Sequence, residues 1–270
     1  DKEIKSLKDN GFDITLQLLD HHITGKVSAA KYDWYFLDDK RCATKIVFDY
    51  LLKEFKAPLN DYKEWVDTVN AVDIWLENEK ENFEFGKVLM SMVTKAREIN
   101  SILFNSLDRD FKFYLLKNSI GFLSLENAPI VLDNSVHSLK KEFLKDGFDD
   151  TLDNLSASYL VKSLDKIKDD LTVYYNGQKG LMTYCLGAIS IPANSFLRAN
   201  SDYDFFIDVG RKGNASFRAD GKLDVSQLAS KLGNGGGHVN ASGCKFDDFI
   251  ETINLQEVRA YIQNKLNNLK

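Results

Sequence analysis

The sequence predicts an α/β protein of two domains, an N-terminal one built on a parallel sheet and a smaller C-terminal one with a mixed sheet. Short apolar runs alternate with stretches of helical spacing along the chain, which is the pattern of such folds. The chain has 270 residues, which is too long for one small hydrophobic core and suits two domains. Its hydrophobic fraction of 44% and charged fraction of 28% are those of an ordinary globular protein.

The N-terminal elements begin with a helix at residues 2–9, which Asn10-Gly11 is expected to end. Residues 14–19 form a short apolar run with polar ends, which predicts a buried parallel strand. The aromatic residues of 32–37 predict a second strand. Further helices are expected at 40–55, at 60–75 and over most of 81–118.

A change in composition near residue 119 marks the expected domain boundary. Residues 119–132 look strand-like, so we expect an N-terminal domain of residues 1–121 and a C-terminal domain of residues 122–270. In the second domain an Asn-Gly turn separates two strand candidates. Helices are predicted at 134–145, 155–168, 191–200, 225–232 and 255–269, and strands at 171–175, 181–186, 205–209, 215–218 and 244–246.

Composition and charge narrow the class of protein further. A net charge of -5 argues against broad, non-specific binding of duplex nucleic acid, but not against a short fragment held in a local pocket. The sequence contains no apolar stretch long enough to span a bilayer, so no membrane partner is expected. The widely separated cysteines are odd in number and are expected to be reduced thiols of a cytoplasmic protein; they are Cys42, Cys185 and Cys244.

A first candidate site follows the strand expected at 14–19, where the chain continues as Asp20-His21-His22. Open α/β sheets place their ligand sites at the carboxyl ends of strands. Neutral imidazole suits Mn, Zn or Fe, and a neighbouring carboxylate can hydrogen-bond the other ring nitrogen and fix the tautomer. The tripeptide therefore looks like half of a metal site; a polar strand end with solvent-facing histidines is the alternative.

A second candidate site is Gly235-Gly236-Gly237-His238, which follows the helix expected at 225–232. Glycine lets the backbone approach an anion closely, so this segment resembles a phosphate cradle with a histidine at its lip. A flexible glycine turn is the alternative interpretation. The small residues that follow, at positions 241–243, argue against this alternative.

These motifs together resemble the DHH phosphoesterase superfamily, in the branch with the DHH-associated C-terminal domain. The resemblance covers nearly the whole chain. Within the superfamily, the chain looks most like the small oligoribonucleases (nano-RNases). The matching segments are Leu18-Leu19-Asp20-His21-His22, Cys42-Ala43-Thr44, Val72-Asp73-Ile74-Trp75, Asn214-Ala215-Ser216-Phe217-Arg218 and Gly235-Gly236-Gly237-His238-Val239-Asn240-Ala241-Ser242-Gly243.

The resemblance implies a role for each matching residue. In the first domain, His21 and Asp73 would be metal ligands, Asp20 would orient His21, and His22 would contact the scissile phosphate. In the second domain, the substrate-binding residues would be Arg218, Gly235, Gly236, Gly237, His238 and Asn240. The complete family site holds two Mn²⁺ ions, with Mg²⁺ as an alternative, and these ions activate a water and stabilise charge on phosphorus.

The chain also departs from the family pattern. An upstream His-x-x-x-Asp-x-Asp loop and a later strand-end aspartate are absent before residue 20, so the N-terminal domain is expected to be partial. We expect these motifs in an N-terminal segment of the parent protein and poor metal binding without them. Cys42 matches a small-residue position of the family and is not expected to be a catalytic thiol.

The resemblance implies a manganese-dependent phosphodiesterase, an oligoribonuclease that trims short RNA oligonucleotides to mononucleotides from the 3′ end. Hydrolysis of cyclic or linear dinucleotides, or of 3′-phosphoadenosine 5′-phosphate, is an alternative within the same class. A nucleotide-binding module that has lost catalysis is the alternative from a different class. The expected partners are short RNA oligonucleotides or dinucleotides, and a second copy of the chain in a homodimer.

Overall fold

The computed structural model describes residues 2–269, which form two compact units. The first unit runs to Lys95 and includes Leu116–Ser135, whereas the second comprises Ala96–Leu115 and the chain from Val136 onward. Helices α6 (Asn105–Ser119) and α7 (Ala128–Leu144) therefore contribute residues to both units. Each compact unit is made of two segments of the chain, so the units cannot be compared with a single boundary. The predicted domain boundary between residues 121 and 122 therefore stays a prediction.

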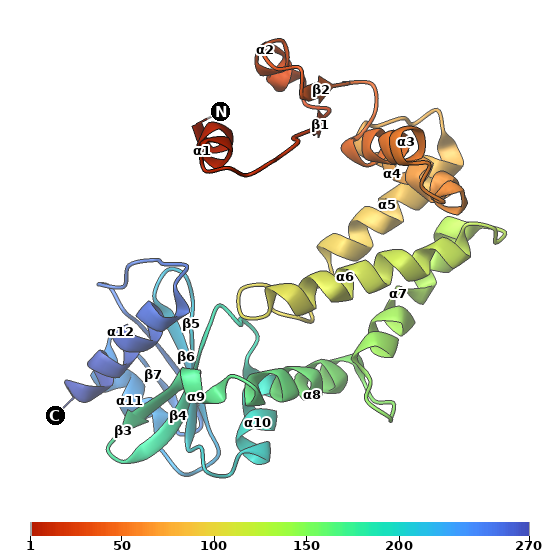
Figure 1. Ribbon diagram of the computed structural model, residues 1–270. Helices are drawn as coiled ribbons and strands as arrows, with labels where there is room; N and C mark the ends of the chain where they lie inside the picture. The colour runs from red at the N-terminus through yellow and green to blue at the C-terminus, as the bar shows by residue number, and fades with distance from the viewer. Residues whose placement is uncertain (1, 270) are drawn as a thin grey trace. The chain divides into compact units, whose positions relative to one another are not determined.

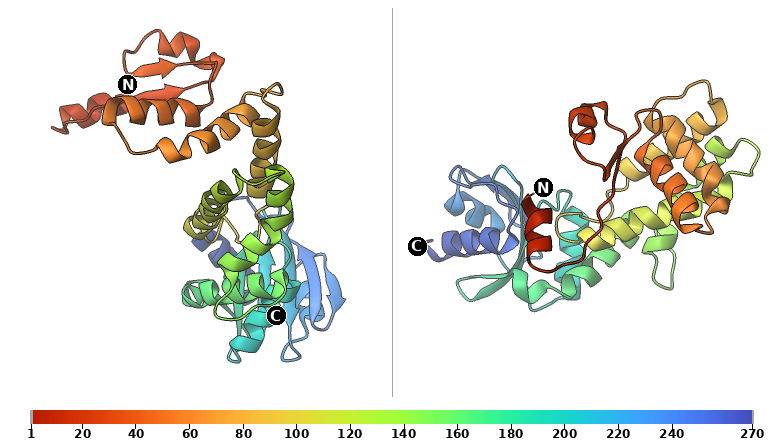
Figure 2. Two further views of the ribbon diagram at one scale, coloured as in Figure 1. Left: turned by 90° about the vertical axis from the view of Figure 1, so that its right-hand side faces the viewer. Right: turned by 45° about the horizontal axis from the view of Figure 1, so that its top comes forward.

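The first unit contains the expected parallel sheet, reduced to two strands. Strands β1 (Leu18–Asp20) and β2 (Tyr35–Leu37) pair in parallel, and the left view of Figure 2 shows them side by side. Only the last two residues of the strand expected at 14–19 lie in β1, because the partner strand offers three residues to pair with. The helices of this unit are α1 (Lys2–Asp9), α2 (Lys26–Ala29), α3 (Ala43–Phe55), α4 (Lys63–Asp73) and α5 (Lys80–Thr94).

Two contacts position helices α3 and α4 around the first candidate site. Asn70 lies one turn before the end of α4, and its Oδ1 accepts a 2.8 Å hydrogen bond from the backbone N–H of Cys42. Cys42 is the N-cap of α3, and its Sγ accepts from Lys45 N at 3.4 Å. The Cys42 side chain thus caps α3, and burial raises the pKa of its thiol.

The strand-like character expected for residues 119–132 is wrong. The end of α6 and a short 3-10 helix (Ile120–Phe122) occupy its first part, and α7 begins at Ala128. Pro129 lies in the first turn of α7, where a missing N–H costs nothing and the fixed φ angle favours a helix. Residues 128–132 are therefore helical, although the spacing of their apolar residues had indicated a strand.

The second unit is built on a six-stranded mixed sheet in the order β3-β4-β5-β6-β8-β7 (Figure 1). Only β4 and β5 pair in parallel; the other neighbours are antiparallel. This confirms the mixed sheet and the α/β class. The strands are β3 (Thr172–Tyr175), β4 (Gln178–Tyr184), β5 (Phe205–Val209), β6 (Asn214–Ala219), β7 (Gly236–His238) and β8 (Ala241–Lys245), and the helices besides α6 and α7 are α8 (Leu152–Asp165), α9 (Lys168–Leu171), α10 (Ser190–Ala199), α11 (Val225–Leu232) and α12 (Leu255–Asn267).

The two faces of this sheet are covered differently. Helix α10 packs on one face, where Phe196 meets Phe206 of β5 with ring centroids 5.9 Å apart. Helix α11 packs on the opposite face, where Ser242 of β8 donates a 2.6 Å hydrogen bond to Val225 O. On the α10 face, the part of the sheet formed by β6, β8 and β7 keeps half-buried or exposed side chains. That part of the sheet, called here the open face, carries the second candidate site.

No helix among the residues that the structure describes is both long and apolar enough to cross a bilayer.

Candidate active site

The Asp20-His21-His22 segment turns sharply at the carboxyl end of β1. Oδ1 of Asp20 accepts hydrogen bonds from the backbone N–H groups of His21 at 2.7 Å and His22 at 3.1 Å. Tyr35 of β2 donates a 2.6 Å hydrogen bond to Oδ2 of the same carboxylate. These bonds, with that of Tyr35 the strongest influence, hold the pKa of Asp20 well below its usual range. The carboxylate therefore stays charged and fixes the turn.

The Asp20 carboxylate contacts the ring of His22 rather than that of His21. Nδ1 of His22 lies 2.9 Å from Oδ1 of Asp20, while His21 approaches Asp20 only through its backbone N–H. The expectation that Asp20 orients the His21 ring is therefore corrected: at a strand end the chain turns, and the carboxylate reaches the second histidine. The His22 side chain is 71% exposed and that of His21 only 19%. One ring thus faces solvent while the other is directed inward.

His21 meets Asp73, as the proposed shared metal requires. Nδ1 of His21 lies 3.6 Å from Oδ2 of Asp73, the last residue of α4. An imidazole and a carboxylate at this separation suit one divalent transition-metal ion. However, the described residues contain no group of three or more His, Cys, Asp or Glu side chains that could hold a metal. The pair therefore fits part of a coordination shell and does not form a complete site.

The second candidate site lies on the open face of the second unit. Arg218 of β6 pairs in register with Ala241 of β8, which in turn pairs with His238 of β7. Directly paired residues point to the same face of an antiparallel sheet, so Arg218 and His238 flank the small Ala241 side chain. Two strand spacings separate their backbones by about 10 Å. The next row of this face consists of Ser216, Gly243 and Gly236, so an anion can approach the backbone closely.

The glycine segment is an edge strand and not a loop. Gly236–His238 pairs with β8, which begins at Ala241, earlier than the strand expected at 244–246. A Cβ atom on Gly237 would lie 2.6 Å from Ala241 O, so the absence of a side chain allows the two strands to lie this close. Asn240 lies in the turn between the strands, and its carbonyl oxygen accepts from Ala219 N at 3.1 Å. Its backbone thus ties the hairpin to the end of β6.

Two residues that the sequence did not identify support Arg218. The guanidinium donates from Nη2 to Ser190 Oγ at 2.9 Å, and Ser190 is the first residue of α10. The loop before α10 is held by Asp208, which accepts from the N–H groups of Leu186 at 2.9 Å and Gly187 at 3.0 Å. Burial raises the pKa of Asp208, although these bonds act in the opposite direction. In the sequence, the role of Asp208 could have been predicted from its position as a single charged residue inside the apolar run of β5.

The two clusters lie in separate compact units. His21, His22, Asp20 and Asp73 come together in the first unit, whereas Arg218, His238 and the glycines come together in the second.

Comparison with known proteins identifies the family. The DHHA1 domain family matches residues 187–268, which include all the substrate-binding candidates. The chain is 43% identical over 260 residues to a 3′,5′-cyclic-nucleotide phosphodiesterase of Helicobacter pylori (strain ATCC 700392 / 26695), with 94% of this chain and 74% of that protein covered. It is 24% identical over 276 residues to the oligoribonuclease NrnB of Bacillus subtilis (strain 168), covering 94% of this chain and 60% of that protein.

A solved structure extends the likeness to the fold. The crystal structure of an uncharacterized protein from Helicobacter pylori G27 matches with a TM-score of 0.86 and 42% identity, covering 99% of this chain and 80% of that one. The chain belongs to the DHH phosphoesterase superfamily, in the branch with a DHHA1 domain. It spans about three quarters of the cyclic-nucleotide phosphodiesterase and three fifths of the oligoribonuclease.

Proposed function

We propose that this chain forms part of a phosphodiesterase that hydrolyses nucleotide phosphodiesters. The observation that carries the proposal is the approach of His21 to Asp73, which lie 52 positions apart in the sequence and 3.6 Å apart in the fold. An inward imidazole beside a carboxylate, with a second, exposed imidazole next to it, is part of the donor set that metal-assisted phosphoester cleavage needs.

Short RNA oligonucleotides, degraded from the 3′ end, are the first candidate substrate. Arg218 and His238, which flank Ala241 on the open face, would bind one phosphate group between them, and the small residues beside them favour this. The net charge of -5 disfavours binding of long nucleic acid along an extended surface. The relative NrnB is named an oligoribonuclease, which agrees with this choice.

A cyclic nucleotide is the second candidate substrate. The relative that is 43% identical is named a 3′,5′-cyclic-nucleotide phosphodiesterase, and it shares more of this sequence than NrnB does. Linear or cyclic dinucleotides and 3′-phosphoadenosine 5′-phosphate present the same phosphoester chemistry and stay alternatives.

The cofactor proposed for this chemistry is Mn²⁺, as a pair of ions in the complete family site, with Mg²⁺ as the alternative. His21 and Asp73 would hold one ion, which would supply a polarised water and positive charge at the phosphate. The chain's own contribution is to position the substrate: exposed His22 would contact the scissile phosphate, and Arg218 and His238 would hold a terminal nucleotide.

The test is hydrolysis of a 5′-labelled dinucleotide and of a 3′,5′-cyclic nucleotide by the full chain with Mn²⁺. We expect product formation that stops with a chelator and in His21→Ala and Asp73→Ala. His137→Ala is the matched control, because His137 is an exposed histidine on α7. Activity that survives His21→Ala would defeat the proposal. Nucleotide binding without any hydrolysis would favour the non-catalytic module instead.

A further inference from the structure

Residues 185–190, called here the connecting segment, lead from the end of β4 into the first turn of α10. The segment begins with a strained residue, because Cys185 has a φ angle of +58°, which residues other than glycine rarely adopt. Such strain persists only where the surrounding structure fixes the backbone, and it is frequent at functional sites. The contacts that fix the connecting segment therefore indicate what it positions.

Hydrogen bonds fix the strained residue from two sides. On the side of the sheet, the N–H of Cys185 donates to Val209 O at 2.8 Å, and the next two N–H groups donate to Asp208 at 2.9 and 3.0 Å. On the other side, the carbonyl oxygen of Cys185 accepts a 2.6 Å hydrogen bond from Nδ2 of Asn100. Asn100 differs from the other partners because it lies outside the sheet.

The side chain of Asn100 serves two parts of the chain at once. Its Oδ1 accepts from the N–H groups of Ile102 at 3.0 Å and Leu103 at 2.8 Å, which closes the turn before α6. Its Nδ2 remains for Cys185 O. An amide carries both an acceptor and a donor, so one side chain can fix its own turn and the strained residue together.

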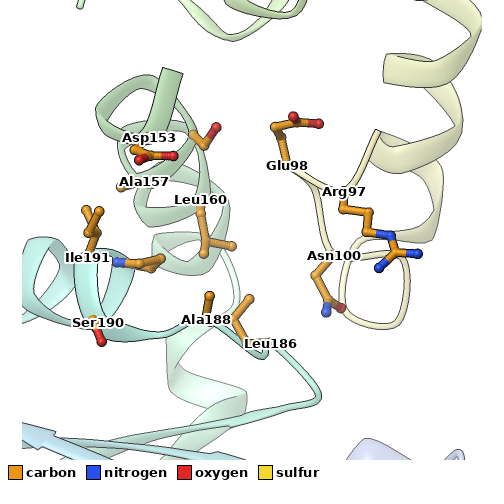
Figure 3. Close-up of a pocket in the computed structure, with 12 residues that line it drawn as sticks. Arg97, Glu98, Asn100, Asp153, Ala157, Leu160, Leu186, Ala188, Ser190 and Ile191 are labelled. Carbon is orange, nitrogen blue, oxygen red and sulfur yellow. The ribbon is translucent and has the colours of Figure 1, made fainter. Parts of the chain in front are cut away.

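The far end of the connecting segment reaches Arg218. The side chain of Ile189 is buried and anchors the start of α10, and the next residue, Ser190, accepts from Nη2 of Arg218 at 2.9 Å. Figure 3 shows Asn100, Leu186 and Ser190 around one cavity, with the hydroxyl of Ser190 pointing away from it. This hydroxyl therefore serves Arg218, and its position depends on the backbone of the connecting segment.

We propose that Asn100 is a positioning residue for Arg218, which it orients through Cys185, the connecting segment and Ser190. The inference rests on the proposed function, because Arg218 is the side chain that would bind a phosphate group of the substrate. Loss of the Asn100 donor lets the strained residue relax and displaces the Ser190 hydroxyl from the guanidinium. The consequence is weaker nucleotide binding by a chain that stays folded.

The first variant, Asn100→Asp, isolates the donor. The carboxylate still accepts from the turn before α6, but it cannot donate to Cys185 O. We expect AMP to bind about threefold to tenfold more weakly, measured by calorimetry on the full chain at pH 8. Asn200→Asp is the matched control, because Asn200 lies at the other end of α10 and donates through the same kind of amide group to Phe196 O at 3.2 Å. The control should change the affinity for AMP by less than about twofold.

Two further measurements test the path from Asn100 to Arg218. In a Ser190→Ala background the path is already interrupted, so Asn100→Asp should weaken AMP binding by less than about twofold more. The NMR order parameter of the Arg218 Nε–H group should fall by about 0.1 or more in Asn100→Asp and stay unchanged in Asn200→Asp. AMP binding by Asn100→Asp that equals that of the unchanged chain, or full weakening in the Ser190→Ala background, overturns the inference.

The results separate this inference from the proposed function. If hydrolysis depends on His21 while Asn100→Asp leaves AMP binding and the Arg218 order parameter unchanged, the function stands and the positioning role falls. If the order parameter falls as expected while the unchanged chain neither binds AMP nor hydrolyses a phosphodiester, the positioning role stands and the function falls.

Discussion

The three consecutive glycines of the DHHA1 domain should respond very differently to alanine. A Cβ atom on Gly235 would lie 2.4 Å from both Cys244 Cβ and Gly243 O, and one on Gly237 would lie 2.6 Å from Ala241 O. A Cβ atom on Gly236 would meet nothing closer than Ser230 Oγ at 3.9 Å. Gly237 also has a φ angle of +146°, which residues with a side chain rarely adopt.

The magnitude follows from these contacts. A strained φ angle costs about 1–3 kcal/mol, and the displacement of backbone atoms adds to it, so Gly237→Ala should cost roughly 2–4 kcal/mol if the hairpin persists. However, β7 is a three-residue edge strand whose residues are all exposed. Detaching this strand relieves the strain, which limits the loss of global stability and moves His238 away from Ala241. Gly236→Ala should change the free energy of unfolding by about 0.5 kcal/mol or less.

The assay is hydrogen exchange of peptides from residues 233–245, followed by mass spectrometry, with urea unfolding monitored in parallel. We expect faster exchange in Gly237→Ala and unchanged exchange in Gly236→Ala. All three tryptophans, at positions 34, 65 and 75, lie in the first unit, so the tryptophan fluorescence transition should not change and serves as an internal control. Equal effects of the two substitutions on exchange would refute the reasoning.

The same pair of variants also measures how closely a phosphate approaches. A phosphate bound by Arg218 and His238 would lie over the neighbouring row of Ser216, Gly243 and Gly236, where the strands carry little or no side chain. Gly236→Ala should therefore weaken binding of a nucleoside monophosphate several-fold while the fold stays intact. Unchanged binding in this variant would place the phosphate elsewhere on the open face.

Three further predictions concern single side chains. Tyr35→Phe removes the hydrogen bond that lowers the pKa of Asp20 most, so this pKa should rise toward its usual value, as measured by NMR titration. Folding lowers the pKa of Asp20 in the unchanged chain, so the stability that the Asp20 carboxylate contributes is present above about pH 4 and is lost as the pH falls. Ser190→Ala removes one of the hydrogen bonds that orient the Arg218 guanidinium, which also donates to Phe217 O, and should raise KM about threefold to tenfold with a smaller change in kcat, measured by steady-state kinetics. Burial raises the pKa of Cys244 to about 11, so this thiol should resist iodoacetamide at pH 8 until urea unfolds the second unit, and any stability it contributes is present at neutral pH and is lost only as the pH rises toward that value.

The sequence predicted where the two elements of the first candidate site end, because strand ends and helix ends are local features. The apolar run before Asp20 predicted a strand end, and the helical spacing before Asp73 predicted a helix end, and β1 and α4 end at these residues. That His21 and Asp73 come within 3.6 Å followed only from the family resemblance, since spacing alone cannot place residues that are far apart in the chain. The contact between Asp20 and the ring of His22 could not be predicted, because it depends on the direction of the turn.

The second candidate site was harder to predict because its geometry depends on strand register. The sequence predicted a phosphate cradle or a flexible turn for the glycine segment, yet Gly236–His238 pairs with β8, and this pairing places Ala241 between His238 and Arg218. Glycine has low strand propensity, so a tertiary contact decided the outcome. Asp208 was visible as a charge within an apolar run, but its role in holding the loop before α10 required the positions of Leu186 and Gly187.

The candidate site residues of the two units differ in their hydrogen bonds. In the first unit, the carboxylate oxygens of Asp20 contact Tyr35 and His22, whereas His21 and Asp73 lie against each other and are the metal ligands of the proposed function. Two protein ligands bind a metal weakly, so the metal of the proposed function would need further donors or the substrate to complete its coordination. In the second unit, Arg218 is already oriented by Ser190 before any substrate arrives. Preorganised binding reduces the entropy cost of holding a nucleotide, so under the proposed function the DHHA1 unit would recognise the substrate and the other unit would cleave the bond.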